Sequence, residues 1–190
     1  NPPDYLLGYL NGLMEAQLRI YGGFLVEDLL TDEMVEEFKA HLPGFFTYPF
    51  DSYLTDKKTT AQLYIGSKIS AMERLRVMEL LSARFAVDLY TASDTSSLPH
   101  VRNCGLAKTL EEMPIIFHNS KINLNITSKP IRSGLPLRIF DILGCGGFLL
   151  TNFQPELPEF FTPDEDLVYY ENLEDLAAKA EYYLHHESRR

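Results

Sequence analysis

Cysteine is scarce in this sequence. Only Cys104 and Cys145 are present, and they stand too far apart for the paired spacings of a metal site or a disulfide framework. The five histidines include no pair at the spacing typical of metal ligands. We therefore expect no metal site and no disulfide-rich secreted fold, and a reducing, cytoplasmic location is the simplest interpretation.

Positive charge is also limited. Lysine and arginine number 17 against 27 aspartates and glutamates, so the formal net charge is −10. A general nucleic-acid binder needs a basic face that neutralises phosphates, and a membrane-surface protein needs a polybasic segment. The acidic excess argues against both classes, and we expect no nucleic-acid partner.

Long apolar runs and glycine-rich nucleotide motifs are missing as well. No run approaches the ~20 apolar residues that span a bilayer, and no secretory signal opens the chain. No GxxxxGK[ST] motif is present, and the glycines at 144–147 follow a predicted helix, which is the reverse of a dinucleotide-binding turn. The chain begins at Asn1 rather than Met, so we expect a piece of a longer protein.

The first 60 residues are predicted to be a helical segment followed by a linker. Leucines recur at helical spacing from Leu6 to Leu18, and Thr31 is a suitable N-cap for a second helix. Prolines, a glycine and turn residues over 42–60 predict a loop.

Residues 61–190 show short apolar runs that alternate with helical patterns. Four helices are predicted. Two begin at capping boxes, Ser70–Glu73 and Thr109–Glu112, and the other two cover 136–144 and 172–187. The predicted strands cover 61–66, 85–91, 100–105, 121–127, 147–152 and 166–170. This alternation predicts a second domain over 61–190, an α/β fold with a Rossmann-like parallel sheet and flanking helices.

One window departs from the acidic character of the chain. Between Met113 and Phe140 there is no aspartate or glutamate, whereas Lys121, Lys129, Arg132 and Arg138 are all present. The window also contains a predicted strand, a glycine-containing loop and the start of a helix. Free backbone N–H groups at a helix start beside cations favour an anion pocket, with a solvated basic loop as the alternative.

Several residues near this window are candidates for ligand contact. Arg138 lies in the first predicted helical turn, where a cation opposes the helix dipole and a bound phosphate would reverse that effect. Asp141 could accept hydrogen bonds from ribose hydroxyls or form a salt bridge with Arg138. Thr127 ends a predicted strand, and Ser67 and Lys68 follow another, where they form either a diphosphate-contacting turn or an ordinary surface turn.

The segments "SKINLNIT", "SGLPLRIFDILGCGGFLLTNFQPELPEFF" and "DLVYYENLEDLAAKAEYYLHHESRR" resemble the carboxyl-terminal domain of CgeB-like proteins. These are bacterial group-1 glycosyltransferases associated with spore maturation. The resemblance covers roughly 61–190. It implies one half of a GT-B fold, the half that binds the nucleotide-diphosphate sugar, with the acceptor-binding amino-terminal domain missing from this chain.

The resemblance also implies site residues. Family members carry two glutamates separated by seven residues; the second position corresponds to Asp141 and the first to Ser133, which is not acidic. A final set of positions is implied to contact the donor through the diphosphate or the base: Ser67, Lys68, Gly105, Leu106, Gly134, Leu135, Pro136 and Leu137. Such enzymes usually need no metal or other cofactor, and the isolated fragment is expected to bind nucleotide with little or no transfer activity.

Other functions stay open at this point. The serine at 133 favours a non-catalytic α/β interaction or nucleotide-binding module. A phospho-receiver domain lacks a convincing acidic cluster at strand ends, and a dinucleotide-dependent oxidoreductase lacks its glycine fingerprint.

Overall fold

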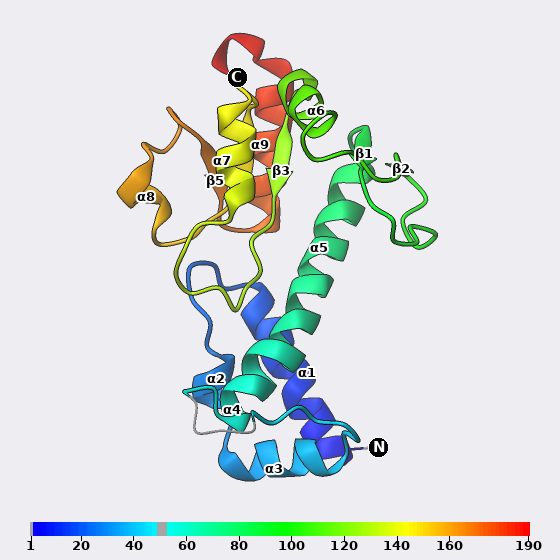
Figure 1. The fold of residues 1–190 in the computed structure, drawn as a ribbon, viewed down its shortest axis with the longest axis vertical. Helices are drawn as coiled ribbons and strands as arrows, with labels where there is room; N and C mark the ends of the chain where they lie inside the picture. Colours follow the sequence, from blue (N-terminus) through cyan, green and yellow to red (C-terminus); the bar gives the residue numbers. More distant parts are fainter. Residues whose placement is uncertain (1, 49–52) are drawn as a thin grey trace. The chain divides into compact units, whose positions relative to one another are not determined.

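The computed structural model describes residues 2–48 and 53–190, which form two compact units. The helical unit contains the chain up to Glu73 together with Ser128–Arg132, and the sheet unit contains Arg74–Thr127 and Ser133–Arg190. Figure 1 shows the elements of both. The domain boundary expected at residue 60 stays a prediction. Within the described ranges, no helix has the length and apolar character needed to cross a membrane.

The helical unit is built around one apolar core. Its elements are α1 (Asp4–Leu18), α2 (Val26–Leu29), α3 (Asp32–Ala40), α4 (Asp56–Lys58), the π-helix η1 (Thr59–Ile65) and the first half of α5 (Gly66–Ser82). The leucine stripe of α1 is buried in this core, which confirms the predicted helix. Thr31 caps α3 by accepting a hydrogen bond from the Met34 N–H, also as predicted.

The strand predicted at 61–66 is wrong. This segment is helical, and η1 runs directly into α5. The reason is that Ala61, Ile65 and Ile69, four residues apart, form one stripe that faces the core. Of the predicted loop at 42–60, residues 49–52 lie outside the described residues, and the end of that range is already helical.

The capping box predicted at Ser70 is also wrong, because α5 has already begun at Gly66. Inside the helix, the Ser70 hydroxyl bonds the Gly66 carbonyl and the Ser128 hydroxyl. The second predicted box fails as well: α6 starts at Met113, and the Glu112 carboxylate accepts a hydrogen bond from the Lys108 N–H instead of capping through Thr109.

The sheet unit contains two parallel sheets. β1 (Val87–Leu89) pairs with β2 (Val101–Asn103), and the larger sheet has the order β3–β4–β5. Its three strands and the helices of the unit are β3 (Asn123–Asn125), β4 (Leu149–Asn152), β5 (Val168–Tyr170), α6 (Met113–Asn119), α7 (Leu137–Gly144), α8 (Leu157–Phe160), α9 (Leu173–His185) and the 3-10 helix η2 (Glu187–Arg189).

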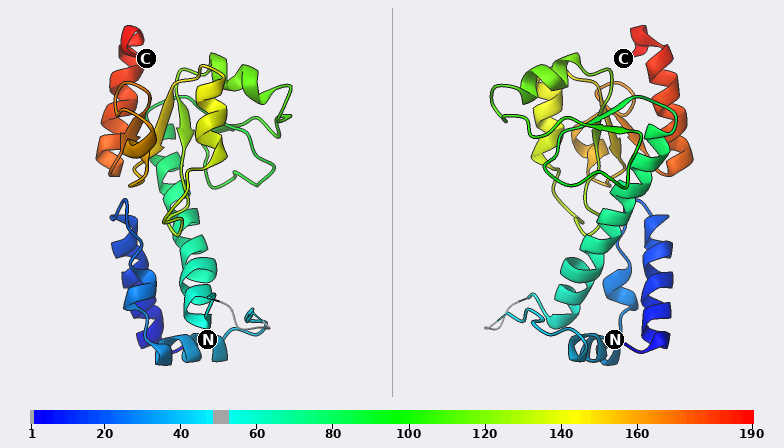
Figure 2. Two further views of the ribbon diagram at one scale, coloured as in Figure 1. Left: turned by 60° about the vertical axis from the view of Figure 1, so that its left-hand side comes forward. Right: turned by 90° about the vertical axis from the view of Figure 1, so that its right-hand side faces the viewer.

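The larger sheet lies between two helices. Figure 2 shows α7 on one side of β3–β5 and α9 on the other. α7 packs on β3 and β4, and α9 packs on β5. Ile139 and Ile142 of α7 are buried against Leu149 of β4. Parallel strands flanked by helices, preceded by a helical segment, confirm the Rossmann-like α/β fold class.

Candidate functional site

Polar side chains gather where β3 and β4 end. The Asn125 amide donates to the hydroxyls of Thr127 and Thr151, at 3.0 and 2.9 Å. Thr127 donates its N–H to the Asn152 side chain at 2.8 Å and its hydroxyl to Gln154 at 2.9 Å. The Asn152 amide donates back to the Thr127 carbonyl at 2.9 Å. We call these five buried residues the polar edge; their bonds fix the carboxyl ends of the two strands.

The polar edge holds the loop that follows β3. The Gln154 amide donates to the Gly134 carbonyl at 3.4 Å, and the Gly134 N–H donates to Oε2 of Glu156 at 2.7 Å. Gly134 has φ of +85°, a conformation that favours glycine. These hydrogen bonds fix the backbone of the loop just before α7. Ser133, the residue before Gly134, is exposed.

The N-terminus of α7 is open to solvent. Pro136 is its N-cap and has no side chain that can cap the helix. None of the described residues accepts a hydrogen bond from the N–H of Leu137 or Arg138, and Leu137 is 79% exposed. Uncapped N–H groups at a helix start carry partial positive charge. This end of α7 can therefore bind an anion.

Arg138 is the cation at this helix end. Its guanidinium lies over the Phe117 ring, 5.3 Å from the centroid, and the residue is exposed. Asp141 is also exposed, and no ion pair joins it to Arg138 in the described part of the chain. The salt bridge considered from the sequence is therefore not formed, and both side chains are available to a ligand.

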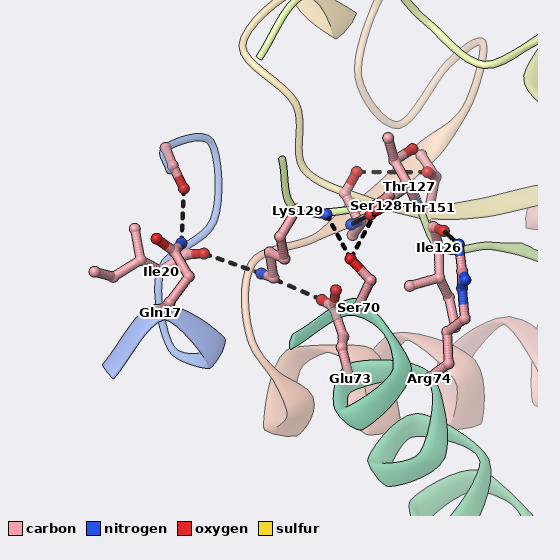
Figure 3. A network of polar contacts seen from close by, with 12 residues as sticks. Gln17, Ile20, Ser70, Glu73, Arg74, Ile126, Thr127, Ser128, Lys129 and Thr151 are labelled. Atoms are coloured by element: carbon pink, nitrogen blue, oxygen red, sulfur yellow. Dashed lines mark hydrogen bonds and ion pairs between the residues drawn. The ribbon is translucent and has the colours of Figure 1, made fainter. Parts of the chain in front are cut away.

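Lys129, the second cation of the acid-free window, belongs to the helical unit. Its ammonium group is buried in the helical unit, 3.2 Å from Glu73 and 2.9 Å from the Ile20 carbonyl that accepts its hydrogen bond (Figure 3). It also lies over the Tyr21 ring at 3.3 Å. Burial lowers the pKa of Lys129, and the charge of Glu73 opposes that effect.

The other two cations of the window are Arg132 and Lys121. Arg132 belongs to the helical unit and lies 4.0 and 3.8 Å from the carboxylates of Glu27 and Asp28. Lys121 precedes β3 and so lies at its amino end, away from the polar edge. Carboxylates far along the chain thus pair with Lys129 and Arg132, which no local pattern in the sequence indicated. Arg138 is the cation of the window that lies in the first turn of α7, and an anion pocket there stays a prediction.

Ser67 and Lys68 do not form the predicted turn after a strand. Both are exposed residues in the first turn of α5. Ser67 lines a hollow of about 260 Å³ in the helical unit, together with Lys58, Thr59 and Gln62 among others. Their contact with a diphosphate stays a prediction.

Gly105 and Leu106 follow β2 in the smaller sheet. Gly105 has φ of +73° and donates its N–H to the Asn103 side chain, while Leu106 is 76% exposed. In the described part of the chain, no hydrogen bond connects them to the polar edge or to α7. Their contact with a base stays a prediction.

Thr127 is at the predicted strand end but is buried, and its hydroxyl and backbone groups bind the protein. It therefore shapes the edge. Sequence reasoning missed three residues there: Asn152, Gln154 and Glu156. Their signal was present, since "TNFQPE" places polar residues directly after the apolar run of β4. Among the described residues, no group of three or more histidine, cysteine, aspartate or glutamate side chains could hold a metal ion.

A comparison with protein families identifies the family to which the chain belongs. A family model described as glycosyl transferase-like matches residues 72–190. The chain belongs to this glycosyl transferase-like family. No curated protein and no solved structure matches the chain. The glycosyl transferase-like region includes the polar edge, the Gly134 loop and α7, and family membership associates it with sugar transfer in general.

Proposed function

We propose that the sheet unit binds a nucleotide-diphosphate sugar as the donor half of a GT-B glycosyltransferase of the CgeB-like group. One observation carries the proposal: the N-terminus of α7 is uncapped and exposed, and it contains Arg138 in its first turn. This end of the helix follows the carboxyl end of β3 in a parallel sheet. Ligands of open α/β sheets bind at this end, and helix N-termini bind phosphate groups. The family match adds sugar transfer as the chemistry.

Different residues would contact the diphosphate, the ribose and the base of the donor. The backbone N–H groups of Leu137 and Arg138 receive the diphosphate, with the Arg138 guanidinium as the added positive charge. Asp141, one helical turn further on, accepts hydrogen bonds from the ribose hydroxyls. Gly105 and Leu106 contact the base through backbone atoms, and Ser67 and Lys68 are two further proposed contacts of the diphosphate.

This arrangement assigns electrostatic stabilisation to the protein itself. When the sugar leaves, negative charge develops on the nucleoside diphosphate, and aligned helix amides and a guanidinium stabilise that charge. The proposed transfer therefore runs without a metal ion or other cofactor. A separate acceptor-binding domain would complete the enzyme, which we propose to be cytoplasmic and bacterial, and the present chain alone would bind donor without transferring it.

Ser133 favours a second candidate function. It is exposed on the loop before α7 and has no carboxylate, whereas the family pattern has an acid there. A protein with this change could bind nucleotide as a non-catalytic interaction module. Slow hydrolysis of a nucleotide sugar by this chain together with an acceptor-binding domain would favour the enzyme, and nucleotide binding without any turnover would favour the module.

Isothermal titration with UDP, GDP, ADP and dTDP tests the binding proposal. The wild-type chain should bind at least one of them, and Arg138→Ala should weaken that binding by about tenfold, the effect of losing one charged hydrogen-bonding partner. Lys121→Ala is the matched control, because it removes an exposed cation at the amino end of β3 and should leave affinity unchanged. Absence of binding by every nucleotide, or equal loss in both variants, contradicts the proposal.

A further inference from the structure

Glu156 contributes a carboxylate to the loop that precedes α7. Its Oε2 accepts a hydrogen bond from the Gly134 N–H at 2.7 Å. The residue is half-buried, at the start of α8. None of the described residues donates a hydrogen bond to its other oxygen, Oε1, and no ion pair engages it in those ranges. One carboxylate oxygen is thus held by the loop, and the other is available.

The loop peptide that Glu156 contacts is held from both sides. Gln154, two residues earlier, donates to the Gly134 carbonyl at 3.4 Å and is fixed in turn by Thr127 at 2.9 Å. Glu156 therefore sits on a peptide that the polar edge positions. The open N–H groups of Leu137 and Arg138 follow only a few residues further along the chain. The carboxylate of Glu156 thus contacts the same loop that carries the open N–H groups at its end.

These two features fit the two chemical parts of a nucleotide sugar. The diphosphate is an anion that needs donors, and the α7 end supplies them. The sugar is a neutral polyol whose hydroxyls need acceptors, and a carboxylate with a free oxygen accepts them strongly. A carboxylate would repel the diphosphate itself, so its place beside this site fits the sugar and not the phosphates.

We infer that Glu156 is the sugar-binding residue of the donor site, with Oε1 accepting hydrogen bonds from sugar hydroxyls while Oε2 stays on Gly134. This inference rests on the proposed function and adds a residue to it. Serine occupies position 133 next to Gly134, so a carboxylate from the segment after β4 supplies the charge that the loop itself lacks.

The test compares each nucleoside diphosphate with its sugar ester, UDP with UDP-glucose and GDP with GDP-mannose. Glu156→Gln keeps one oxygen for the Gly134 N–H but replaces the second oxygen with an amide donor. Titration should show the sugar ester weakened by about tenfold or more, while the affinity for the nucleoside diphosphate stays equal or rises, because the variant removes a negative charge. Glu159→Gln, an exposed acid on the same helix, is the matched control and should change neither affinity.

The outcomes separate the inference from the proposed function. If no probe binds the wild-type chain, both fail. If the diphosphates bind but Glu156→Gln weakens both probes equally, or leaves the affinity for the sugar ester unchanged, the inference is overturned and the proposed function survives. If Glu156→Gln does not fold, Glu156→Asp decides on the same comparison, because it keeps the charge and withdraws the carboxylate by one methylene.

Discussion

Lys129 and Glu73 form a buried ion pair in the helical unit, with 3.2 Å between Nζ and Oε1 and side chains only 4% and 2% exposed. The pair attaches the segment Ser128–Arg132 to α5, and the Ser70 hydroxyl accepts a further hydrogen bond from the Lys129 N–H. Lys129, which the sequence analysis grouped with the cations of a possible anion pocket, therefore stabilises the helical unit.

Removing one partner of this pair should be costly. Lys129→Met leaves the Glu73 carboxylate buried without its cation, and we expect the free energy of unfolding to fall by about 3–5 kcal/mol. The double variant Lys129→Met/Glu73→Leu removes both charges and should recover most of that loss. Urea denaturation of the three proteins measures the difference. A single variant as stable as the wild type would show that the pair is not buried.

Alkaline pH should act on Tyr21. Burial raises the pKa of its phenol, and the charge of Glu73 and a hydrogen bond to it act in the same direction. The unfolded chain loses this proton near pH 10 while the folded chain keeps it. The contribution of Tyr21 is therefore complete below pH 10 and is lost as the pH rises above it.

Tyr21→Phe isolates this effect. The free energy of unfolding of the wild type, minus that of the variant, should be constant between pH 8 and 9.5 and should decrease above pH 10. Lys129 titrates in both proteins, so its contribution largely cancels in the difference. A difference that stays flat to pH 11 contradicts the raised pKa.

Gly66 has no room for a side chain. A Cβ there would lie 2.2 Å from Cγ of Pro130 and 3.0 Å from the Ala61 carbonyl oxygen. We expect Gly66→Ala to lower stability by about 1–3 kcal/mol through overpacking. Gly12→Ala on α1, where nothing lies within 4 Å, should instead raise stability by about 0.5–1 kcal/mol. Thermal melting of both variants checks the opposite signs.

Asn152 joins β4 to the end of β3 through two hydrogen bonds to the Thr127 backbone, at 2.8 and 2.9 Å. Asn152→Ala leaves a buried N–H and a buried carbonyl without these bonds, and we expect a loss of about 2–4 kcal/mol. Asn119→Ala removes one exposed side-chain bond to the Ile115 carbonyl and should cost less than about 1 kcal/mol. Denaturant titration compares the two, and equal losses would contradict the structural role of Asn152.

The sequence predicted those parts of the fold that depend on local periodicity. The strands β3, β4 and β5 and the helices α1, α7 and α9 have regular apolar patterns, and all were found where expected. The run at 61–66 is too short for its period to separate a strand from a buried helix, and the neighbouring core decided for the helix.

The candidate site was predictable only in part, for an electrostatic reason. The open end of α7 follows from Pro136 and the apolar pattern after it. The partners of Lys129 and Arg132 lie far away along the chain, at Glu73 and Glu27, and no local pattern reveals such pairs. The role of Glu156 could not be predicted, because its hydrogen bond with Gly134 joins two loops that are separate in the sequence.

The five residues of the polar edge are all amides or alcohols: Asn125, Thr127, Thr151, Asn152 and Gln154. None of these groups gains or loses a proton in the ordinary range of buffers. The hydrogen bonds that fix the two strand ends and position Gly134 therefore involve no group whose charge depends on acidity, and the geometry of this edge should stay the same across that range.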